Sequence, residues 1–404
     1  MMFKKYPLAK IADYDVEEFL NLGNNFVSLN SNQKKIVYIP AWNNGNSKPT
    51  LAILKQNPRL LDLINKKNNY ILLDFASEMI IGDLSLFDNF SVPVKILSCY
   101  TKFNHNDLLE KYNVDTVLYA NILGLKTCKW NEHIFEDYAS KKIDNLSYTK
   151  KIATLYIGKS RPSRLITLNY FNKLNILNDC YYTFINNNHT TINELEQIFY
   201  SVKKYYPNLA NNKSYWDNDF LYTLLQQGPI NADLLNSFYE ITPKHGLDSF
   251  FSIILETDRY SPIHLSFANK DNKHKINLVG DSNFYNHVSQ SIFTTEKTFK
   301  SFVMLHPYTI FAAKGHIQDL RDRGYDTFDD IINHNYNNED NYETNLVKFL
   351  DESIRLIKLG KQYWISFCKD NINRLYNNYK IFQNEMGSKD ILDIHNDIKN
   401  FFQR

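Results

Sequence analysis

The sequence predicts an α/β protein made of two doubly wound domains. The chain has 404 residues, which is more than one ordinary domain contains and fits two. Short apolar runs alternate with polar stretches of helical periodicity in both halves, as strand–helix–strand units require. Hydrophobic residues make up 43% of the chain and aromatic residues 15%, so there is enough apolar material for buried cores.

Four apolar runs in the first third of the chain are predicted to be parallel strands. They lie at 36–39, 70–75, 94–100 and 116–120. Between the first two, residues 49–64 carry apolar side chains at helical spacing, and 106–112 are expected to form another short helix. This alternation is typical of a doubly wound sheet, so we predict a first Rossmann-like domain over 1–145.

A charged stretch at 136–151 is predicted to end this domain, because it lacks periodicity and a strong strand follows it. A second Rossmann-like domain is predicted over 150–340. Its expected strands are 153–157, 181–185, 250–256 and 308–312. Its expected helices are 163–174, 192–205, 214–227, one that opens at 294–297, and 316–323.

The last part of the chain, 341–404, is predicted to be a C-terminal helical region. Apolar residues recur there at helical spacing over about 342–382. The asparagine-rich segments 186–188 and 333–341 are expected to be loops, because asparagine favours turns.

The charge balance and the cysteines exclude several classes of protein. The chain has 46 basic and 44 acidic residues, which excludes the strongly basic balance of a nucleic-acid coat protein but is compatible with a local basic cleft. The four cysteines form no CxxC pair, so neither a zinc ribbon nor a disulfide framework is indicated. The sequence shows no secretory leader and no apolar stretch of membrane-spanning length. We therefore expect a cytoplasmic protein with no membrane partner.

The segment 293–328 joins a helix start, a buried strand and a second helix start. Thr294 or Thr295 is placed to cap the first helix, whose free N–H groups and positive dipole end suit a diphosphate. Glu296 is a candidate acceptor of hydrogen bonds from ribose hydroxyls.

Two lysines and a glycine complete this segment. Lys297 or Lys300 would supply the positive charge that a pyrophosphate leaving group requires. Gly315 follows the second strand and allows close approach of the backbone where the next helix begins. The alternative is that these Thr, Glu and Lys patterns only cap helices and cover solvated helix faces.

Three basic residues follow the strand predicted at 153–157. Lys159, Arg161 and Arg164 lie between this strand and a helix, where guanidinium groups can bind phosphate oxygens through two hydrogen bonds. Arg164 is the first candidate for this contact. The alternative is a basic turn that is merely exposed to solvent.

Glu256 ends the apolar strand predicted at 250–256. Because the carboxyl ends of strands line the ligand crevice in doubly wound sheets, Glu256 is a candidate contact for a sugar or a ribose. The alternative is that it caps the element that follows. His245, His306 and His316 are further candidates for acid/base or phosphate contacts, although a lone histidine is more often structural. No DxD motif with strand–loop placement is found, so a bound metal is not implied.

These motifs carry a resemblance to known enzymes. The segment 293–328 resembles the C-terminal signature of phage-encoded and bacterial GT-B glycosyltransferases, and its TTEKTF also resembles the donor motif of α1,3-fucosyltransferases. Upstream, 157–184 is similar to the arginine-bearing strand–loop–helix that opens the same donor domain. The resemblance covers about half of the chain and extends more weakly to the N-terminal half.

The resemblance implies a GT-B architecture, in which two Rossmann-like domains face a cleft and the C-terminal helix returns to the first domain. It implies a nucleotide-sugar donor as co-substrate, with UDP as the nucleotide by family habit, and no permanently bound cofactor. In those relatives a Glu-Lys pair engages the nucleotide, which would assign this role to Glu296 and Lys297. Helix dipoles and basic side chains would neutralise the leaving diphosphate without a metal.

The N-terminal domain would then bind the acceptor and carry the general base, because transfer to a hydroxyl requires removal of its proton. Asp74 and Glu78 are the candidates, since they lie at the end of an apolar strand and one helical turn apart. The competing interpretation is that Asp74 caps a helix.

Three functions remain open from the sequence. One is a phage enzyme that transfers glucose or arabinose to 5-hydroxymethylcytosine in duplex DNA, acting in the host cytoplasm. The abundance of Asn beside Lys, Ile and Tyr, typical of AT-rich genomes including many viral ones, motivates it. The second is transfer to a glycan, a lipid-linked sugar or a protein, and the third is a non-catalytic sugar-nucleotide-binding module. The oligomeric state is left open.

Overall fold

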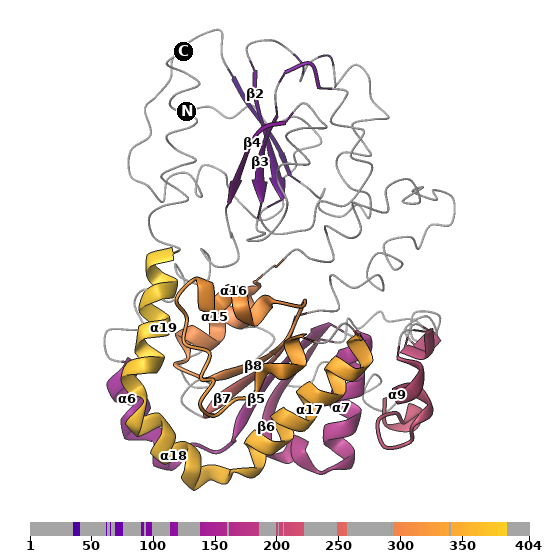
Figure 1. Ribbon diagram of the computed structural model, residues 1–404, viewed down its shortest axis with the longest axis vertical. Helices are drawn as coiled ribbons and strands as arrows, with labels where there is room; N and C mark the ends of the chain where they lie inside the picture. The colour runs from indigo at the N-terminus through magenta and orange to yellow at the C-terminus, as the bar shows by residue number, and fades with distance from the viewer. Residues whose placement is uncertain are drawn as a thin grey trace. The chain divides into compact units, whose positions relative to one another are not determined.

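A computed structural model of the protein shows a mixed α/β architecture with two parallel sheets (Figure 1). It describes residues 35–40, 62, 65, 69–75, 90–92, 94–98, 114–119, 138–159, 161–185, 199–200, 202–204, 206–221, 249–256, 292, 294–338 and 341–385. These residues fall into two compact units. The first contains the described residues up to 119 with 292, 384 and 385, and the second contains the described residues of 138–256 and 294–383.

The first unit is built on four parallel strands in consecutive order. They are β1 (Lys35–Pro40), β2 (Asn69–Phe75), β3 (Val94–Ser98) and β4 (Val114–Tyr119). Ile71, Leu72 and Leu73 are successive residues of β2 and all are buried, so both faces of this strand are covered. All four predicted strands are therefore confirmed, whereas the helices expected at 49–64 and 106–112 lie outside the described residues apart from Asp62.

The second unit is built on another four-stranded parallel sheet. Its strands are β5 (Ala153–Lys159), β6 (Cys180–Ile185), β7 (Phe251–Leu255) and β8 (Tyr308–Phe311). Their order is β6-β5-β7-β8, so the chain passes from β5 to one side and then returns to the other side with β7. The point where the order reverses, between β5 and β7, is where doubly wound sheets open a ligand crevice at the carboxyl ends of their strands.

The helices of this unit include those predicted at 163–174, from 294–297 and at 316–323, and also one at 138–145, inside the charged stretch for which no helix was predicted. Their bounds are α6 (Tyr138–Asn145), η3 (Leu146–Tyr148), α7 (Pro162–Lys173), η4 (Ile176–Asp179), α9 (Pro207–Asn211), α15 (Glu296–Val303), α16 (His316–Asp322) and η7 (His334–Asn338). Pro162 occupies the first position of α7, where the missing N–H costs no hydrogen bond. The short 3-10 helix η7 forms inside 333–341, so the prediction that this segment is only a loop is wrong. Asn337 holds the turn, because its side chain bonds Ala313 O and Ile317 N.

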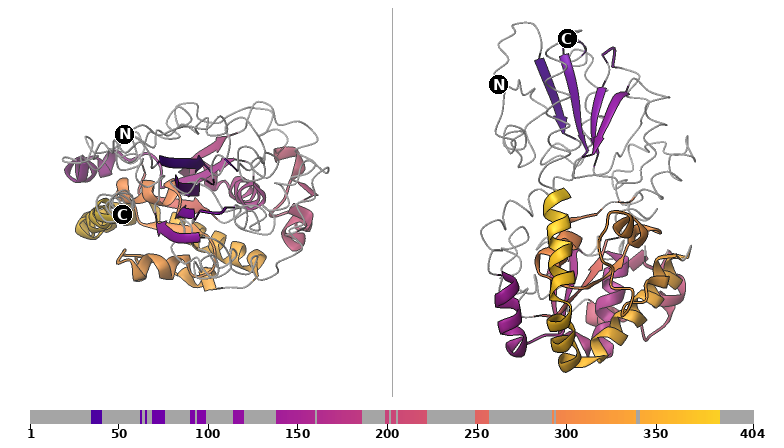
Figure 2. Two further views of the ribbon diagram at one scale, coloured as in Figure 1. Left: turned by 90° about the horizontal axis from the view of Figure 1, so that it is seen from above. Right: turned by 60° about the vertical axis from the view of Figure 1, so that its left-hand side comes forward.

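The predicted helical tail consists of three helices, α17 (Tyr342–Lys358), α18 (Gly360–Asp370) and α19 (Ile372–Asn384), which follow the outside of the second unit (Figures 1 and 2). The chain turns between the first two at Gly360, whose φ of 80° favours glycine. The ring of Trp364 stacks on Phe251 of β7 at 4.8 Å, and Phe382 stacks on Phe299 at 5.0 Å. These helices therefore complete the core of the second unit as far as 383.

The return of a C-terminal helix from the region 341–404 to the first domain stays a prediction, as does the division of the chain at 145, 150 and 340. Of the helices expected at 192–205 and 214–227, only parts are described, and those parts are helical around 199–204 and 218–221. No helix among the described residues is long and apolar enough to cross a membrane.

Candidate functional site

The candidate site lies in the second unit, at the carboxyl ends of β5 and β7. Glu256 directly follows β7 and is only 2% exposed. Thr295 is the N-cap of α15, and its hydroxyl oxygen lies 2.7 and 2.6 Å from the two carboxylate oxygens of Glu256. Thr298 Oγ1 adds a hydrogen bond of 3.0 Å to the same carboxylate. The strand end and the helix start are thus joined through one buried carboxylate.

This arrangement gives Glu256 a defined local role. Its Oε1 also accepts a hydrogen bond of 3.3 Å from the backbone N–H of Thr295, so the carboxylate lies at the positive end of the α15 dipole. Meanwhile Thr295 Oγ1 accepts from Lys297 N at 3.3 Å, which is the side-chain cap expected from the sequence. Glu256 therefore joins the end of β7 to the N-terminal end of α15.

Two lysines lie in the first turns of the same helix. Lys297 Nζ is 3.8 Å from Glu256 Oε2 and 3.3 Å from Thr295 Oγ1, and its side chain is 12% exposed. Lys300 is buried one turn further on. A buried carboxylate needs a compensating positive charge, which Lys297 provides, while the small exposed part of its side chain is accessible from solvent.

Arg164 reaches this cluster from β5's side of the sheet. It lies in the first turn of α7, is 6% exposed, and its Nη2 donates a hydrogen bond of 2.9 Å to Leu255 O at the end of β7. The guanidinium group therefore spans the point where the strand order reverses. Arg161, the N-cap of α7, is partly exposed, and the side chain of Lys159 lies outside the described residues.

A second helix is tied to the start of α15. Arg323, at the end of α16, has its Nη1 3.3 Å from Thr294 Oγ1 and 3.4 Å from Asp319 Oδ2. Sequence analysis did not single out this pair, because an acidic and a basic residue four apart on a helix usually mark a solvated face. Asp319 is instead only 3% exposed. The signal that this pair lies beside the start of α15 is the hydrogen bond from Arg323 to Thr294, which forms only in the folded chain.

Gly315 and His316 begin α16 after β8. Gly315 has a φ of 83° and is the N-cap of this helix, so the glycine is required by the backbone itself. His316 is 1% exposed, and its Nε2 has no hydrogen-bond partner among the described residues. Burial lowers the pKa of His316 to about 4, so the imidazole is neutral at pH 7.

The remaining predicted residues divide between other places and undescribed side chains. His306 lies at the opposite edge of the sheet, before β8, where its ring nitrogens contact Ser252 Oγ at 3.0 Å and Ser249 O at 2.9 Å. It therefore has a structural role at the amino ends of the strands. Asp74 is in β2 of the first unit, and Glu296 begins α15. The side chains of both, together with Glu78 and His245, lie outside the described residues.

The second unit therefore brings together Arg164, Glu256, Thr295 and Lys297 at the end of β7, and we call these four residues the strand-end cluster. With one carboxylate and two cations, this cluster is suited to binding oxygen atoms of an anionic ligand. Among the described residues there is no group of three or more His, Cys, Asp or Glu side chains arranged to hold a metal ion. No family model, curated protein or solved structure matches the chain.

Proposed function

We propose that the protein is a nucleotide-sugar-dependent glycosyltransferase of the GT-B type, and that the carboxyl edge of the β6-β5-β7-β8 sheet holds the donor. One observation carries this proposal. Arg164 and Lys297, which are 133 positions apart in the printed sequence, both contact the end of β7, next to the point where the strand order reverses. Doubly wound sheets bind nucleotides at this position.

The chemistry of sugar transfer fits these side chains. Breaking the bond between the sugar and a nucleoside diphosphate leaves negative charge on the departing phosphate oxygens. Fixed positive groups that face this charge lower the barrier, because they need no reorganisation during the reaction. Arg164 and Lys297 are held in place by Leu255 O and by Glu256, so both are preorganised. We assign Glu256 and Thr295 the role of positioning Lys297 and the start of α15.

Glu296, Lys300 and Gly315 are proposed to complete the donor site, with Glu296 accepting hydrogen bonds from the ribose hydroxyls. Lys159 and Arg161 would extend it beyond β5. We assign the acceptor to the first unit, because the second unit is proposed to bind the donor. The general base would then be Asp74 or Glu78. A UDP-sugar is the proposed donor.

The test is turnover of a panel of UDP- and GDP-sugars by the purified chain. Each donor is incubated with duplex DNA containing 5-hydroxymethylcytosine, with a panel of glycans and proteins, and without any acceptor. Nucleotide release is measured, and the mass of each acceptor is determined by mass spectrometry. A gain of one sugar mass on DNA would establish a DNA glycosyltransferase, and a gain on a glycan or protein would establish the other acceptor class.

Two results would count against the proposal. Donor binding without release of nucleotide in any reaction would indicate a non-catalytic sugar-nucleotide-binding module. Failure to bind any nucleotide or nucleotide-sugar in equilibrium dialysis would remove the basis of the donor-site assignment.

A further inference from the structure

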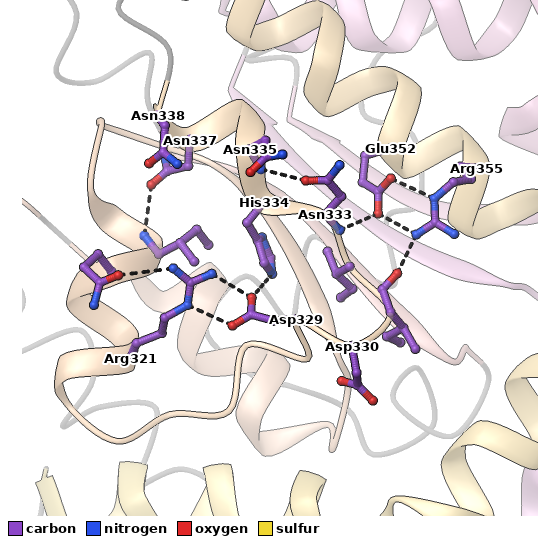
Figure 3. Close-up of a pocket in the computed structure, with 14 residues that line it drawn as sticks. Arg321, Asp329, Asp330, Asn333, His334, Asn335, Asn337, Asn338, Glu352 and Arg355 are labelled. Atoms are coloured by element: carbon purple, nitrogen blue, oxygen red, sulfur yellow. Dashed lines mark hydrogen bonds and ion pairs between the residues drawn. The ribbon is translucent and has the colours of Figure 1, made fainter.

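A polar pocket lies in the second unit beside α16, η7 and α17 (Figure 3). Its volume is about 720 Å³. Sites for small molecules usually enclose roughly 300–1,000 Å³, so the pocket has the size of a ligand site. None of the residues of the strand-end cluster lines it, and it is therefore a separate feature of this unit.

Four charged side chains of the lining form two ion pairs with one another. Arg321 donates from Nε and Nη2 to the two oxygens of Asp329 at 2.9 and 2.7 Å. Arg355 similarly donates to both oxygens of Glu352 at 2.8 and 2.6 Å. Because each guanidinium already faces a carboxylate, neither arginine presents the open pair of donors that a phosphate group requires.

The third carboxylate of the lining is also paired. Asp330 accepts hydrogen bonds from Nη1 and Nη2 of Arg374 at 2.9 and 2.8 Å, so every Arg, Asp and Glu of the described lining is in an ion pair. His334 is buried and adds no charge, because its Nε2 donates to Thr327 O at 2.8 Å and leaves Nδ1 to accept from Tyr336 at 2.9 Å. Burial lowers the pKa of this histidine, which favours the same neutral form at pH 7. An anionic ligand is therefore disfavoured.

Amide groups supply most of the remaining lining. The lining amides are Gln318, Asn333, Asn335, Asn337 and Asn338. Asn333 and Asn337 are fixed: Asn333 Oδ1 accepts from Asn335 N at 3.0 Å, and Asn337 bonds Ala313 O and Ile317 N at 3.1 Å each. Asn335 is exposed, and Figure 3 shows it next to Asn333 in the lining. Gln318 also uses both ends of its amide, since its Oε1 accepts from Arg321 and its Nε2 donates to Asp322. Asn335 and Asn338, whose side chains make no hydrogen bond among the described residues, can each offer a ligand both a donor and an acceptor.

We propose that this pocket binds a neutral carbohydrate. Hydroxyl groups both donate and accept, so a sugar can donate to the remaining lone pairs of Asp329 or Glu352 and accept from the amides of Asn335 and Asn338. The rigid ion pairs fix these positions before binding, which lowers the entropy lost on binding. The described residues of the lining include no Trp, Tyr or Phe, so hydrogen bonds must supply the affinity. We therefore expect dissociation constants of about 1 mM. The inference does not depend on glycosyl transfer.

The test is saturation-transfer NMR on the full chain, free of nucleotide, with a panel of neutral mono- and disaccharides. Glucuronate and glucose 6-phosphate serve as charged counterparts. We expect saturation transfer to at least one neutral sugar and none to the charged ones. The double variant Asn335→Ala/Asn338→Ala removes two lining amides and should weaken binding about tenfold or more.

The matched control is Asn178→Ala, which removes an exposed asparagine from η4, outside the pocket. This variant should bind as the unmodified chain does. Circular dichroism melting shows whether each variant is folded. Three outcomes would overturn the inference: no neutral sugar receives saturation, the charged sugars bind better, or the folded double variant binds unchanged. Since no nucleotide is present, these outcomes are independent of whether the strand-end cluster binds a donor.

Discussion

At the scale of single residues, Lys297 has two roles in the strand-end cluster: it balances a buried charge and it is available to a ligand. Lys297 neutralises the buried Glu256 at 3.8 Å and keeps a small exposed part of its side chain. Arg164 is more deeply buried and bonds a backbone carbonyl, so its removal would disturb the fold as well as a ligand. Lys297 is therefore the better residue for a test of ligand binding.

We predict that Lys297→Ala weakens binding of a nucleotide-sugar about tenfold or more, because a hydrogen bond to a charged group contributes about 1.5–3 kcal/mol. Lys297→Arg should keep most of the affinity, since it retains the charge. The control Lys358→Ala changes an exposed lysine at the end of α17 and should bind normally. Isothermal titration calorimetry measures the affinities. Unchanged binding by a folded Lys297→Ala variant would rule out this contact.

At the scale of elements, two helix boundaries are fixed by single residues. Thr295 joins α15 to Glu256, and Gly360 separates α17 from α18. The two depend on different physics. Thr295 acts through hydrogen bonds in the folded state, whereas Gly360 acts through the backbone conformation that only glycine adopts without strain.

Thr295→Ala is expected to lower the free energy of unfolding by about 1–3 kcal/mol, because it removes a helix cap and two short contacts to a buried carboxylate. Urea denaturation followed by circular dichroism measures the change. Thr344→Ala, at an exposed position in the first turn of α17, is the control and should change stability by less than about 0.5 kcal/mol. Equal stability of the two variants would show that Thr295 does not hold α15.

Gly360→Ala should destabilise the protein by about 1–2 kcal/mol. The added methyl group meets nothing within 4 Å, so the cost arises from the φ of 80° and not from a steric clash. The same urea denaturation measures it. If Gly360→Ala were neutral, the turn between α17 and α18 would have to tolerate a different backbone conformation.

At the scale of the whole molecule, buried histidines link stability to pH. Burial lowers the pKa of His316 to about 4 and also lowers that of His334. The unfolded chain then binds protons more tightly than the folded chain, so protonation favours unfolding. The stability contributed by the neutral imidazoles is complete above their ordinary pKa of 6.5 and is lost as the pH falls towards the folded values.

We therefore predict that the free energy of unfolding decreases between about pH 6.5 and about pH 4. One pKa unit corresponds to about 1.4 kcal/mol, so His316 alone can account for a few kcal/mol. Urea denaturation at several pH values measures the profile. His316→Gln should flatten it, because this variant cannot take up the proton. The same slope in the variant and in the unmodified chain would contradict the role of His316.

The sequence by itself determined the α/β class, the eight described strands and the helix starts at Pro162 and Thr295, because apolar runs and caps are local patterns. It did not determine the strand order, and the meeting of Arg164, Leu255 and Glu256 follows from that order. The polar pocket beside α16, η7 and α17 likewise went unpredicted. Its ion pairs look like ordinary surface charges in the sequence, and the asparagine-rich 333–341 looks like a loop. Only the tertiary structure places them around one cavity, because the packing of η7 against α16 and α17 decides which side chains face each other.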